Sequence, residues 1–344
     1  MKILALNSGS FSFKWELFND DLVIEKEGNY EAEGIAIENN FERALSEIGD
    51  IKEISVIGHR VVHGGRDFTE TTKITPEVLE KLKKYNNLAP LHNPVNLRCV
   101  EVSRELLTAV DSYAVFDTAF YKDLPEIAKV YAIPFKYYEE GIQRYGFHGI
   151  SHNYVAEETA KKLNKPLEEC NLITIHLGGG SSITAIEKGK AVDTSMGLTP
   201  LEGLVMGTRS GDIDAGLVLK LVKDLGSVEK AEELLNRQSG LKGLTSLNDF
   251  RDILKAKENG DEKANLAFDI FVYRIKKYIG AYMAILGGVH AVAFTGAIGA
   301  GQKITREAII SGTLNPLRDI PIFAFKTGEG IQIAKEVKNK FVHN

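Results

Sequence analysis

The amino-acid sequence predicts an α/β protein of two domains, and two observations support that prediction. Apolar runs that resemble strands alternate with segments of helical periodicity along most of the chain, which is typical of sheets flanked by helices. The chain has 344 residues, more than the roughly 250–300 that a single core usually supports. A shift in composition near Thr118–Pro125 is where we expect the two domains to divide.

The first part of the chain is expected to begin with a strand, a turn of small residues and a returning strand. These strands are predicted at Ile3–Asn7 and Phe11–Phe18. Apolar residues at helical spacing then predict helices at Pro76–Tyr85 and Val95–Leu107. A short apolar run predicts a further strand at Ser112–Phe116.

The second part repeats the strand, small-residue turn and returning strand, with strands at Leu172–Leu177 and Ile183–Glu187 around the turn Gly178–Ser182. The similarity is a weak internal repeat. Before it, a helix is expected at Ser151–Leu163, with Ser151 as its N-cap. After it, helices are expected at Ala215–Asp224, Val228–Leu235, Lys263–Leu286 and Gly330–Lys340, and strands at Val289–Thr295 and Ile320–Phe325.

Charge and composition exclude several functional classes. The net charge is −5 and the pI is about 6.0, so we expect neither nucleic acid nor anionic lipid as a partner. The two cysteines are too few for a disulfide scaffold, and the apolar start is too short for a signal peptide, so we expect a cytoplasmic protein. Residues 279–301 carry no Asp, Glu, Lys or Arg, but Gly287-Gly288 favours a buried helix, a turn and a strand over a membrane span.

Three glycine-containing turns follow predicted strands and are candidates for binding phosphate. Glycine allows several backbone N–H groups to point at one anion, which suits Asn7–Lys14 and Gly178–Ser182. Neither is a Walker motif, and the alternative is a tight hairpin turn. Gly296–Gly301 is a weaker nucleotide signal, and its alternative is a helix entry that needs small residues.

Charged residues at strand ends and between glycines are further candidates. Arg60 ends an apolar strand and Arg209 lies between glycines; each is an anion clamp or a salt-bridge partner. Asp117 ends a strand, where α/β proteins place working residues, although it could equally cap the next turn. His148 and His152 have the spacing of a zinc site but lack the intervening glutamate, and Gly149 is expected to break the helix between them. A hydrogen-bonding histidine at a helix start is therefore favoured.

Taken in order, the motifs of this chain resemble one family. They read Asn-Ser-Gly-Ser-x-Ser-x-Lys, Gly-His-Arg-Val-Val-His-Gly-Gly, Ala-Pro-Leu-His-Asn-Pro, Phe-Asp-Thr-Ala-Phe, Tyr-Gly-Phe-His-Gly-x-Ser-His, Asp-Thr-Ser-Met-Gly-x-Thr-Pro-Leu-Glu-Gly and Met-Gly-Thr-Arg-Ser-Gly-Asp-Ile-Asp. This set resembles the acetokinase family, the acetate kinases of the acetate and sugar kinase, heat-shock chaperone and actin superfamily. The resemblance covers almost the whole chain.

The resemblance implies a homodimer whose subunits have two actin-like (ribonuclease H-like) domains, each a mixed sheet flanked by helices, with ATP in the cleft between them. Residues 1–118 plus 330–344 would form one domain and residues 119–329 the other, which would carry most of the nucleotide site. The implied activity is reversible, Mg²⁺-dependent, in-line transfer of the ATP γ-phosphate to acetate, giving acetyl phosphate and ADP.

The resemblance also implies roles for individual residues. The implied catalytic residues are Arg60, Asp117, His148 and Arg209, with Asp117 organising magnesium, water and arginine. The implied magnesium residues are Asn7 and Glu329, and the implied acceptor pocket, to which Arg60 also belongs, is formed by Val62, Leu91, Phe147 and Pro200. The implied nucleotide-binding residues are Ser10, Ser12, Lys14, His176, Leu177, Gly178, Gly179, Gly180, Asp249, Phe250, Arg251, Ala297, Ile298, Gly299, Ala300 and Gly301.

Departures from the family pattern leave two alternatives open. Gly179 replaces the usual asparagine, the turn at Gly296–Gly301 lacks its usual Glu-Asn ending, and Gly328 and Gly330 flank Glu329 where Asn and Glu are usual. A propionate or butyrate kinase of the same family is one alternative, because an extra methylene is worth only about 1–3 kcal/mol in a pocket. The other is a degenerate nucleotide-binding module.

Overall fold

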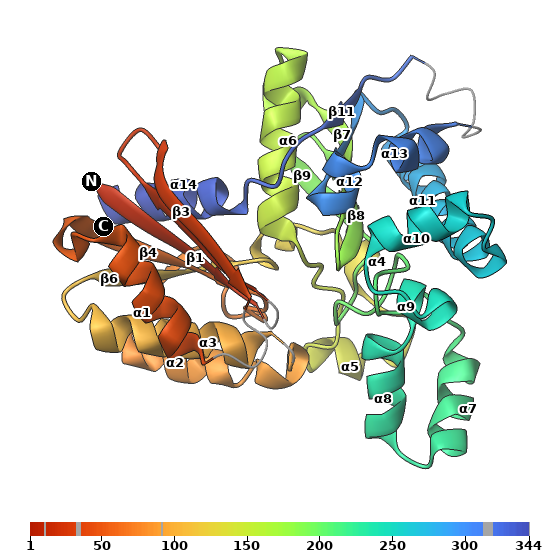
Figure 1. Ribbon diagram of the computed structural model, residues 1–344, viewed down its shortest axis with the longest axis horizontal. Coiled ribbons are helices and arrows are strands. Elements are labelled where there is room, and N and C mark those ends of the chain that lie inside the picture. The colour runs from red at the N-terminus through yellow and green to blue at the C-terminus, as the bar shows by residue number, and fades with distance from the viewer. Residues whose placement is uncertain (10–11, 32–35, 91, 312–318, 344) are drawn as a thin grey trace. The chain divides into compact units, whose positions relative to one another are not determined.

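The computed structural model describes residues 1–9, 12–31, 36–90, 92–311 and 319–343 (Figure 1). The chain forms two compact units. The first consists of Met1–Lys122, Phe147–Tyr154 and Gly328–Asn344, and the second of Asp123–Gly146 and Val155–Thr327. The segment 147–154, which the sequence assigned to the second domain, lies in the first unit.

The first unit is built on a mixed sheet. In sheet order its described strands are β3 (Ile24–Glu31), β2 (Ser12–Phe18), β1 (Lys2–Ser8), β4 (Ile54–Val61), β6 (Asp111–Phe116) and β5 (Thr72–Lys73). The meander β1–β2–β3 is antiparallel, whereas β1, β4 and β6 run parallel to one another. Parallel strands end at the same edge of a sheet, so the residues that follow β1, β4 and β6 are neighbours.

Helices cover both faces of this sheet, because successive side chains of a strand point to opposite sides. Leu4 and Leu6 of β1 pack in a core with α1 and α3, whereas Ile3 and Ala5 pack against α14. In Figure 1, α1 to α3 and α14 lie on opposite sides of these strands. The helices are α1 (Ile37–Ile48), α2 (Pro76–Lys83), α3 (Asn93–Leu106) and α14 (Glu329–Val342).

The second unit repeats the arrangement. Its described strands, in sheet order, are β11 (Ile322–Ala324), β10 (Ala291–Thr295), β7 (Asn171–Leu177), β8 (Ser181–Glu187) and β9 (Lys190–Thr194). Here β7–β8–β9 is an antiparallel meander, and β10 and β11 run parallel to β7. The order β9-β8-β7-β10-β11 matches β3-β2-β1-β4-β6, so the weak repeat in the sequence corresponds to a repeated topology.

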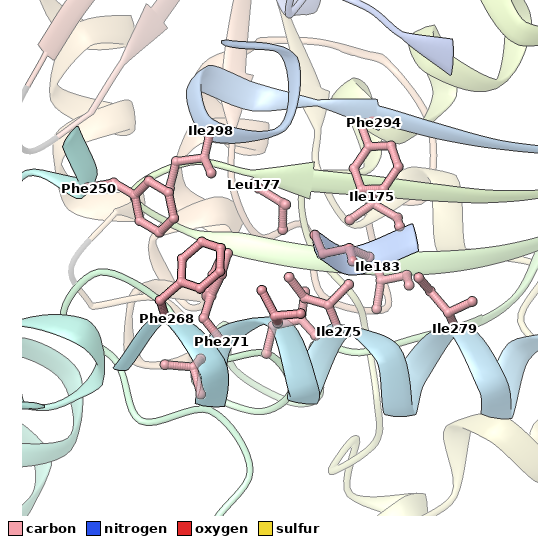
Figure 2. Packing of buried hydrophobic residues seen from close by; sticks show 14 of the residues in the cluster. Ile175, Leu177, Ile183, Phe250, Phe268, Phe271, Ile275, Ile279, Phe294 and Ile298 are labelled. Atoms are coloured by element: carbon pink, nitrogen blue, oxygen red, sulfur yellow. The ribbon is translucent and has the colours of Figure 1, made fainter. Parts of the chain in front are cut away.

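The long helix α11 (Glu262–Leu286) contributes more buried side chains to the core of the second unit than any other element. Figure 2 shows Phe268, Phe271 and Ile275 of this helix facing Ile175 and Ile183 of β7 and β8. The helix α6 (Gly149–Leu163) begins in the first unit and continues in the second. The remaining helices are α4 (Glu126–Lys129), α5 (Lys136–Glu139), α7 (Ala215–Leu225), α8 (Val228–Arg237), α9 (Gly240–Thr245), α10 (Phe250–Glu258), α11 (Glu262–Leu286), α12 (Gly296–Gly301) and α13 (Lys303–Ile310).

Two local expectations, both at the start of α6, were wrong. Helix α6 begins at Gly149 rather than after Ser151, so Ser151 is not its N-cap and Gly149 does not break the helix. Gly296–Gly301 forms the short helix α12, which agrees with the helix-entry alternative for this segment.

The charge-free segment 279–301 has the expected order, since α11 ends at Gly287 in the left-handed conformation and the strand β10 follows. Among the helices in the described ranges, none is long and apolar enough to cross a membrane.

The fold class predicted from the sequence, two mixed sheets flanked by helices, is confirmed.

Candidate active site

Arg60 and Asp117 meet at the carboxyl ends of β4 and β6. The Asp117 N–H donates to the Val61 carbonyl at 3.1 Å, which extends the parallel pairing of the two strands. Nη2 of Arg60 lies 2.6 Å from Oδ2 of Asp117, and Nε lies 3.2 Å from both carboxylate oxygens. Asp117 is almost fully buried and Arg60 is 17% exposed. Both carboxylate oxygens of Asp117 therefore contact the Arg60 guanidinium.

Burial shifts the ionisation of both partners in this pair. Burial raises the pKa of the Asp117 carboxyl, the Glu329 charge adds to that rise, and Arg60 opposes it. For Arg60, burial favours the neutral form, but the charges of Asp117 and Glu329 outweigh it and raise the pKa above its usual value. The guanidinium is thus a permanent, oriented cation.

The third residue around Arg60 is Asn7, at the end of β1. Its Oδ1 accepts a hydrogen bond from Nη1 of Arg60 at 3.0 Å, and its Nδ2 donates to Oε2 of Glu329 at 2.8 Å. Glu329 is the first residue of α14. This series of hydrogen bonds, Asp117–Arg60–Asn7–Glu329, therefore brings together residues from three strand ends and one helix start.

His148, the residue before α6, has an unusual backbone conformation. Its φ is 58°, in the left-handed region that non-glycine residues rarely adopt. The next residue, Gly149, donates its N–H to the Asp117 carbonyl at 3.0 Å. A methyl group at position 149 would lie 2.0 Å from that same oxygen. The close approach requires glycine and fixes His148 beside Asp117.

Two of the expected acceptor-pocket residues lie in the first unit. Val62 and Phe147 are both buried, and Phe147 packs edge-on against His63 with ring centroids 5.5 Å apart. Helix α3 holds this region through two asparagines. Asn93 bonds both backbone groups of His63 (2.9 and 3.0 Å), and Asn96 accepts from the Val62 N–H at 3.1 Å.

The first phosphate turn is partly described. The Gly9 N–H donates to the Ser12 carbonyl at 2.8 Å, so these two residues lie side by side where β1 ends and β2 begins. Lys14 of β2 forms a 2.9 Å ion pair with Glu16. Ser10 and Leu91, expected at the phosphates and in the acceptor pocket, lie outside the described residues.

In the second unit, the glycine turn and the Arg209 loop are joined. The Gly178 N–H donates to the Gly180 carbonyl at 2.9 Å, and the Gly207 N–H donates to the Gly179 carbonyl at 3.2 Å. Arg209 Nη1 donates to the Pro200 carbonyl at 3.2 Å. Burial lowers the pKa of Arg209 to about 10, so this guanidinium is still charged at neutral pH.

A partly buried network of hydrogen bonds holds the segment that carries Pro200. Nη1 of Arg144 donates to the carbonyls of Thr194 and Met196 at 3.1 and 3.0 Å, and Nη2 forms a 2.5 Å ion pair with Glu202. The hydroxyl of Tyr131 donates to the other Glu202 oxygen at 2.7 Å. The sequence analysis assigned no role to these three side chains, although Glu202 lies within one of the family motifs.

On the expected nucleotide side, several side chains point into the core instead. Figure 2 shows Phe250, Leu177 and Ile298 within the apolar cluster above α11. Their side chains therefore pack in the core of the second unit. Asp249 caps α10 and forms an ion pair with the exposed Arg251.

The other expected nucleotide residues lie at strand and helix ends. His176 is buried near the end of β7. In α12, Gly299 is buried, and Arg306 of α13 donates to the carbonyls of Gly299 and Ala300 at 2.8 and 2.7 Å. Ala297 and Gly301 are exposed at the surface of the same helix.

The comparisons with known proteins agree with one another. The family model described as the acetokinase family matches residues 24–317. The chain is 46% identical to the acetate kinase of Halothermothrix orenii, over 90% of this chain and 86% of the relative. It matches the crystal structure of Porphyromonas gingivalis acetate kinase with a TM-score of 0.88 at 35% identity, covering 99% of both chains. A propionate kinase from Francisella tularensis subsp. tularensis matches with a TM-score of 0.89 at 36% identity, covering 97% of this chain and 98% of that one.

Proposed function

Since this chain belongs to the acetokinase family and is a phosphotransferase that acts on acetate, we propose that it moves the γ-phosphoryl group of ATP by direct, in-line transfer. A carboxylate oxygen of acetate attacks the γ-phosphorus, the bond to the bridging oxygen breaks, and acetyl phosphate and ADP form. The same residues serve the reverse reaction. The observation that supports this most strongly is Arg60, a cation oriented by Asp117 on one side and Asn7 on the other.

The chemistry explains why charge, rather than a base, is needed. Acetate is already ionised at neutral pH, so no proton has to be removed from it. The barrier arises from bringing two anions together, and fixed cations lower it by stabilising charge on the transferring phosphoryl group. Arg60 and His148 are the groups of the first unit that we assign to this role, and Arg209 serves the same transfer. Asp117 acts through Arg60 and is a positioning residue.

Magnesium fits the residues at Asn7 and Glu329. A carboxylate and an amide oxygen are hard ligands of the kind that Mg²⁺ prefers, and Mg²⁺ usually takes only one or two protein ligands beside phosphate oxygens and water. Within the described ranges, no cluster of three or more His, Cys, Asp or Glu side chains could hold a metal ion. We propose that Asn7 and Glu329 hold a Mg²⁺ ion that arrives with the nucleotide, where it would neutralise phosphate charge.

The glycine turn at Gly178–Gly180 is the part of the second unit that we assign to the nucleotide phosphates. A methyl group at position 179 would meet no atom within 4 Å, so this backbone is open to a ligand. The exposed Asp249–Arg251 pair and the surface of α12 remain candidates for the adenosine side.

The test is an assay with ATP, Mg²⁺ and acetate in which hydroxylamine traps acetyl phosphate. We expect trapped product with the wild-type protein and a loss of at least 100-fold in kcat with Arg60→Ala, since removing one preorganised donor costs about 10²–10³. Absence of product at high enzyme concentration would refute the kinase proposal and favour the degenerate nucleotide-binding module.

The acceptor range is decided by the same assay run with propionate and butyrate. The structural match to a propionate kinase supports testing a longer acceptor, whereas the buried Val62 and Phe147 favour a small one. We propose acetate as the preferred acceptor, which predicts the highest kcat/KM for acetate. A higher value for propionate would reassign the acceptor within the family.

We also propose that the protein works as a homodimer in the cytoplasm. Helix α7 supports the first part, because this apolar helix has no buried residue, and Leu219 is 66% exposed. A large exposed apolar surface is typical of an interface. Light scattering with size-exclusion chromatography should give twice the monomer mass, and Leu219→Glu should shift it toward the monomer. A monomeric wild-type protein would contradict the proposal.

A further inference from the structure

Glu16 is a buried carboxylate on one face of β2. In the β1–β2 pairing, Glu16 lies opposite Ala5 and Lys14 lies opposite Asn7. Opposite residues share a face, so these side chains all lie on the side that α14 covers. Their neighbour Phe18 belongs to the core there. Burying a charge among apolar groups is unfavourable unless it is paired, so Glu16 needs a reason to be at this position.

Each carboxylate oxygen of Glu16 has a different neighbour. Oε1 lies 2.9 Å from Nζ of Lys14. Oε2 lies against Gly330, the second residue of α14, where a methyl group would be only 1.3 Å away. No side chain at position 330 fits without displacing the carboxylate. The start of α14 is also a favourable place for a negative charge, because the helix dipole and free N–H groups point there.

Gly328, the residue before Glu329, also has no space for a side chain. A methyl group at Gly328 would lie 2.3 Å from the ring of Tyr154. Glu329 therefore sits between two glycines, one covered by a tyrosine ring and the other by the Glu16 carboxylate. The two contacts fix the start of α14, and with it the carboxylate that bonds Asn7 at 2.8 Å.

We propose that Glu16 is a positioning residue for nucleotide binding, which fixes Lys14 through Oε1 and the backbone at Gly330 through Oε2. A single carboxylate thereby sets the position of the lysine relative to Glu329. The inference rests on the proposed function, because it takes from the family resemblance that Lys14 binds the nucleotide whose phosphoryl group is transferred. It goes further, because it makes tight binding of the nucleotide depend on the contact between Glu16 and Gly330.

A double-mutant cycle tests the link to Lys14. Glu16→Ala should raise both the KM and the Kd for Mg·ATP roughly tenfold while kcat changes less, as expected when binding is lost equally in ground and transition states. Glu16→Gln keeps the shape and an acceptor oxygen, so it should recover part of the affinity. In a Lys14→Met background, Glu16→Ala should add little, because coupled residues are not additive. Fully additive losses of affinity would overturn the positioning role.

A steric exchange tests the link to Gly330. Gly330→Ala should weaken Mg·ATP binding about as much as Glu16→Ala, and the double variant Glu16→Ala/Gly330→Ala should be no weaker than Glu16→Ala alone, because the new methyl then has space. Gly280→Ala on α11 is the matched control, since a methyl group there meets no atom within 4 Å. If Gly330→Ala binds as tightly as the Gly280→Ala control, the proposal is wrong.

Calorimetric Kd values separate this proposal from the proposed function. A wild-type protein that binds Mg·ATP without forming acetyl phosphate refutes the transfer reaction but leaves the Glu16 cycle measurable. A wild-type protein that makes acetyl phosphate, with Glu16→Ala unchanged in Kd, refutes only the role of Glu16. Melting temperatures of each variant, compared with Gly280→Ala, identify any variant that has lost its fold, and Glu16→Gln then decides the case.

Discussion

Replacing Arg144 by glutamine should destabilise the second unit far more than removing a surface arginine. Arg144 is 16% exposed, and it joins Glu202 to a segment whose carbonyls it bonds at Thr194 and Met196. Glutamine is shorter and neutral, so it leaves the Glu202 charge without its cation.

The magnitude follows from the geometry. Breaking a fully buried ion pair costs about 3–5 kcal/mol, because one charge stays behind unpaired. Glu202 is 33% exposed and keeps its bond from Tyr131, so we take about 2 kcal/mol for the pair. The lost carbonyl bonds from a charged donor add about 1–2 kcal/mol. A total loss of about 3 kcal/mol in the free energy of unfolding lowers the melting temperature of a domain of this size by roughly 6–12 °C.

The assay is thermal unfolding followed by circular dichroism, with Arg237→Gln as the matched control. Arg237 forms an exposed ion pair with Glu233 on α8 at 3.4 Å. Such pairs are worth about 0.3–0.5 kcal/mol, so the control should change by about 2 °C or less. Equal shifts in the two variants would refute the reasoning. Because the Arg144 network also holds the segment with Pro200, Arg144→Gln should raise the KM for acetate in the same protein.

Two further predictions concern the first unit. Gly149→Ala should reduce kcat at least tenfold, because its methyl group would lie 2.0 Å from the Asp117 carbonyl oxygen. The control Gly280→Ala should leave kcat unchanged, since its methyl group meets no atom within 4 Å. Steady-state kinetics of both variants test this, and equal kcat values would contradict it. The acid limb of kcat, measured with saturating acetate ion and Mg·ATP, should have an apparent pKa above the value of about 3.9 of an ordinary aspartate. Burial raises the pKa of Asp117, and protonation of Asp117 as the pH falls removes the charge that orients Arg60. An apparent pKa of 3.9 or lower would show that Asp117 does not control the acid limb.

Much of the fold could be read from local patterns. The two strand–turn–strand units and the helix over Lys263–Leu286 have strong periodicity, and β7, β8 and α11 lie within a residue or two of the expected ranges. Element ends were less predictable. The start of α6 was misplaced because it depends on His148 adopting a left-handed backbone that only the contact between Gly149 and Asp117 enforces.

The sequence by itself determined that Asp117 ends a strand, that Arg60 ends another, and that the chain carries the motifs of one kinase family. Only the tertiary structure decided which distant residues meet. The Asn7–Glu329 bond joins positions 322 apart, and Glu16 lies against Gly330. Likewise, only the structure shows that the side chain of Phe250 packs in the core of the second unit. Periodicity states which face of an element a residue occupies, but the pairing of strands and the packing of helices determine what covers that face.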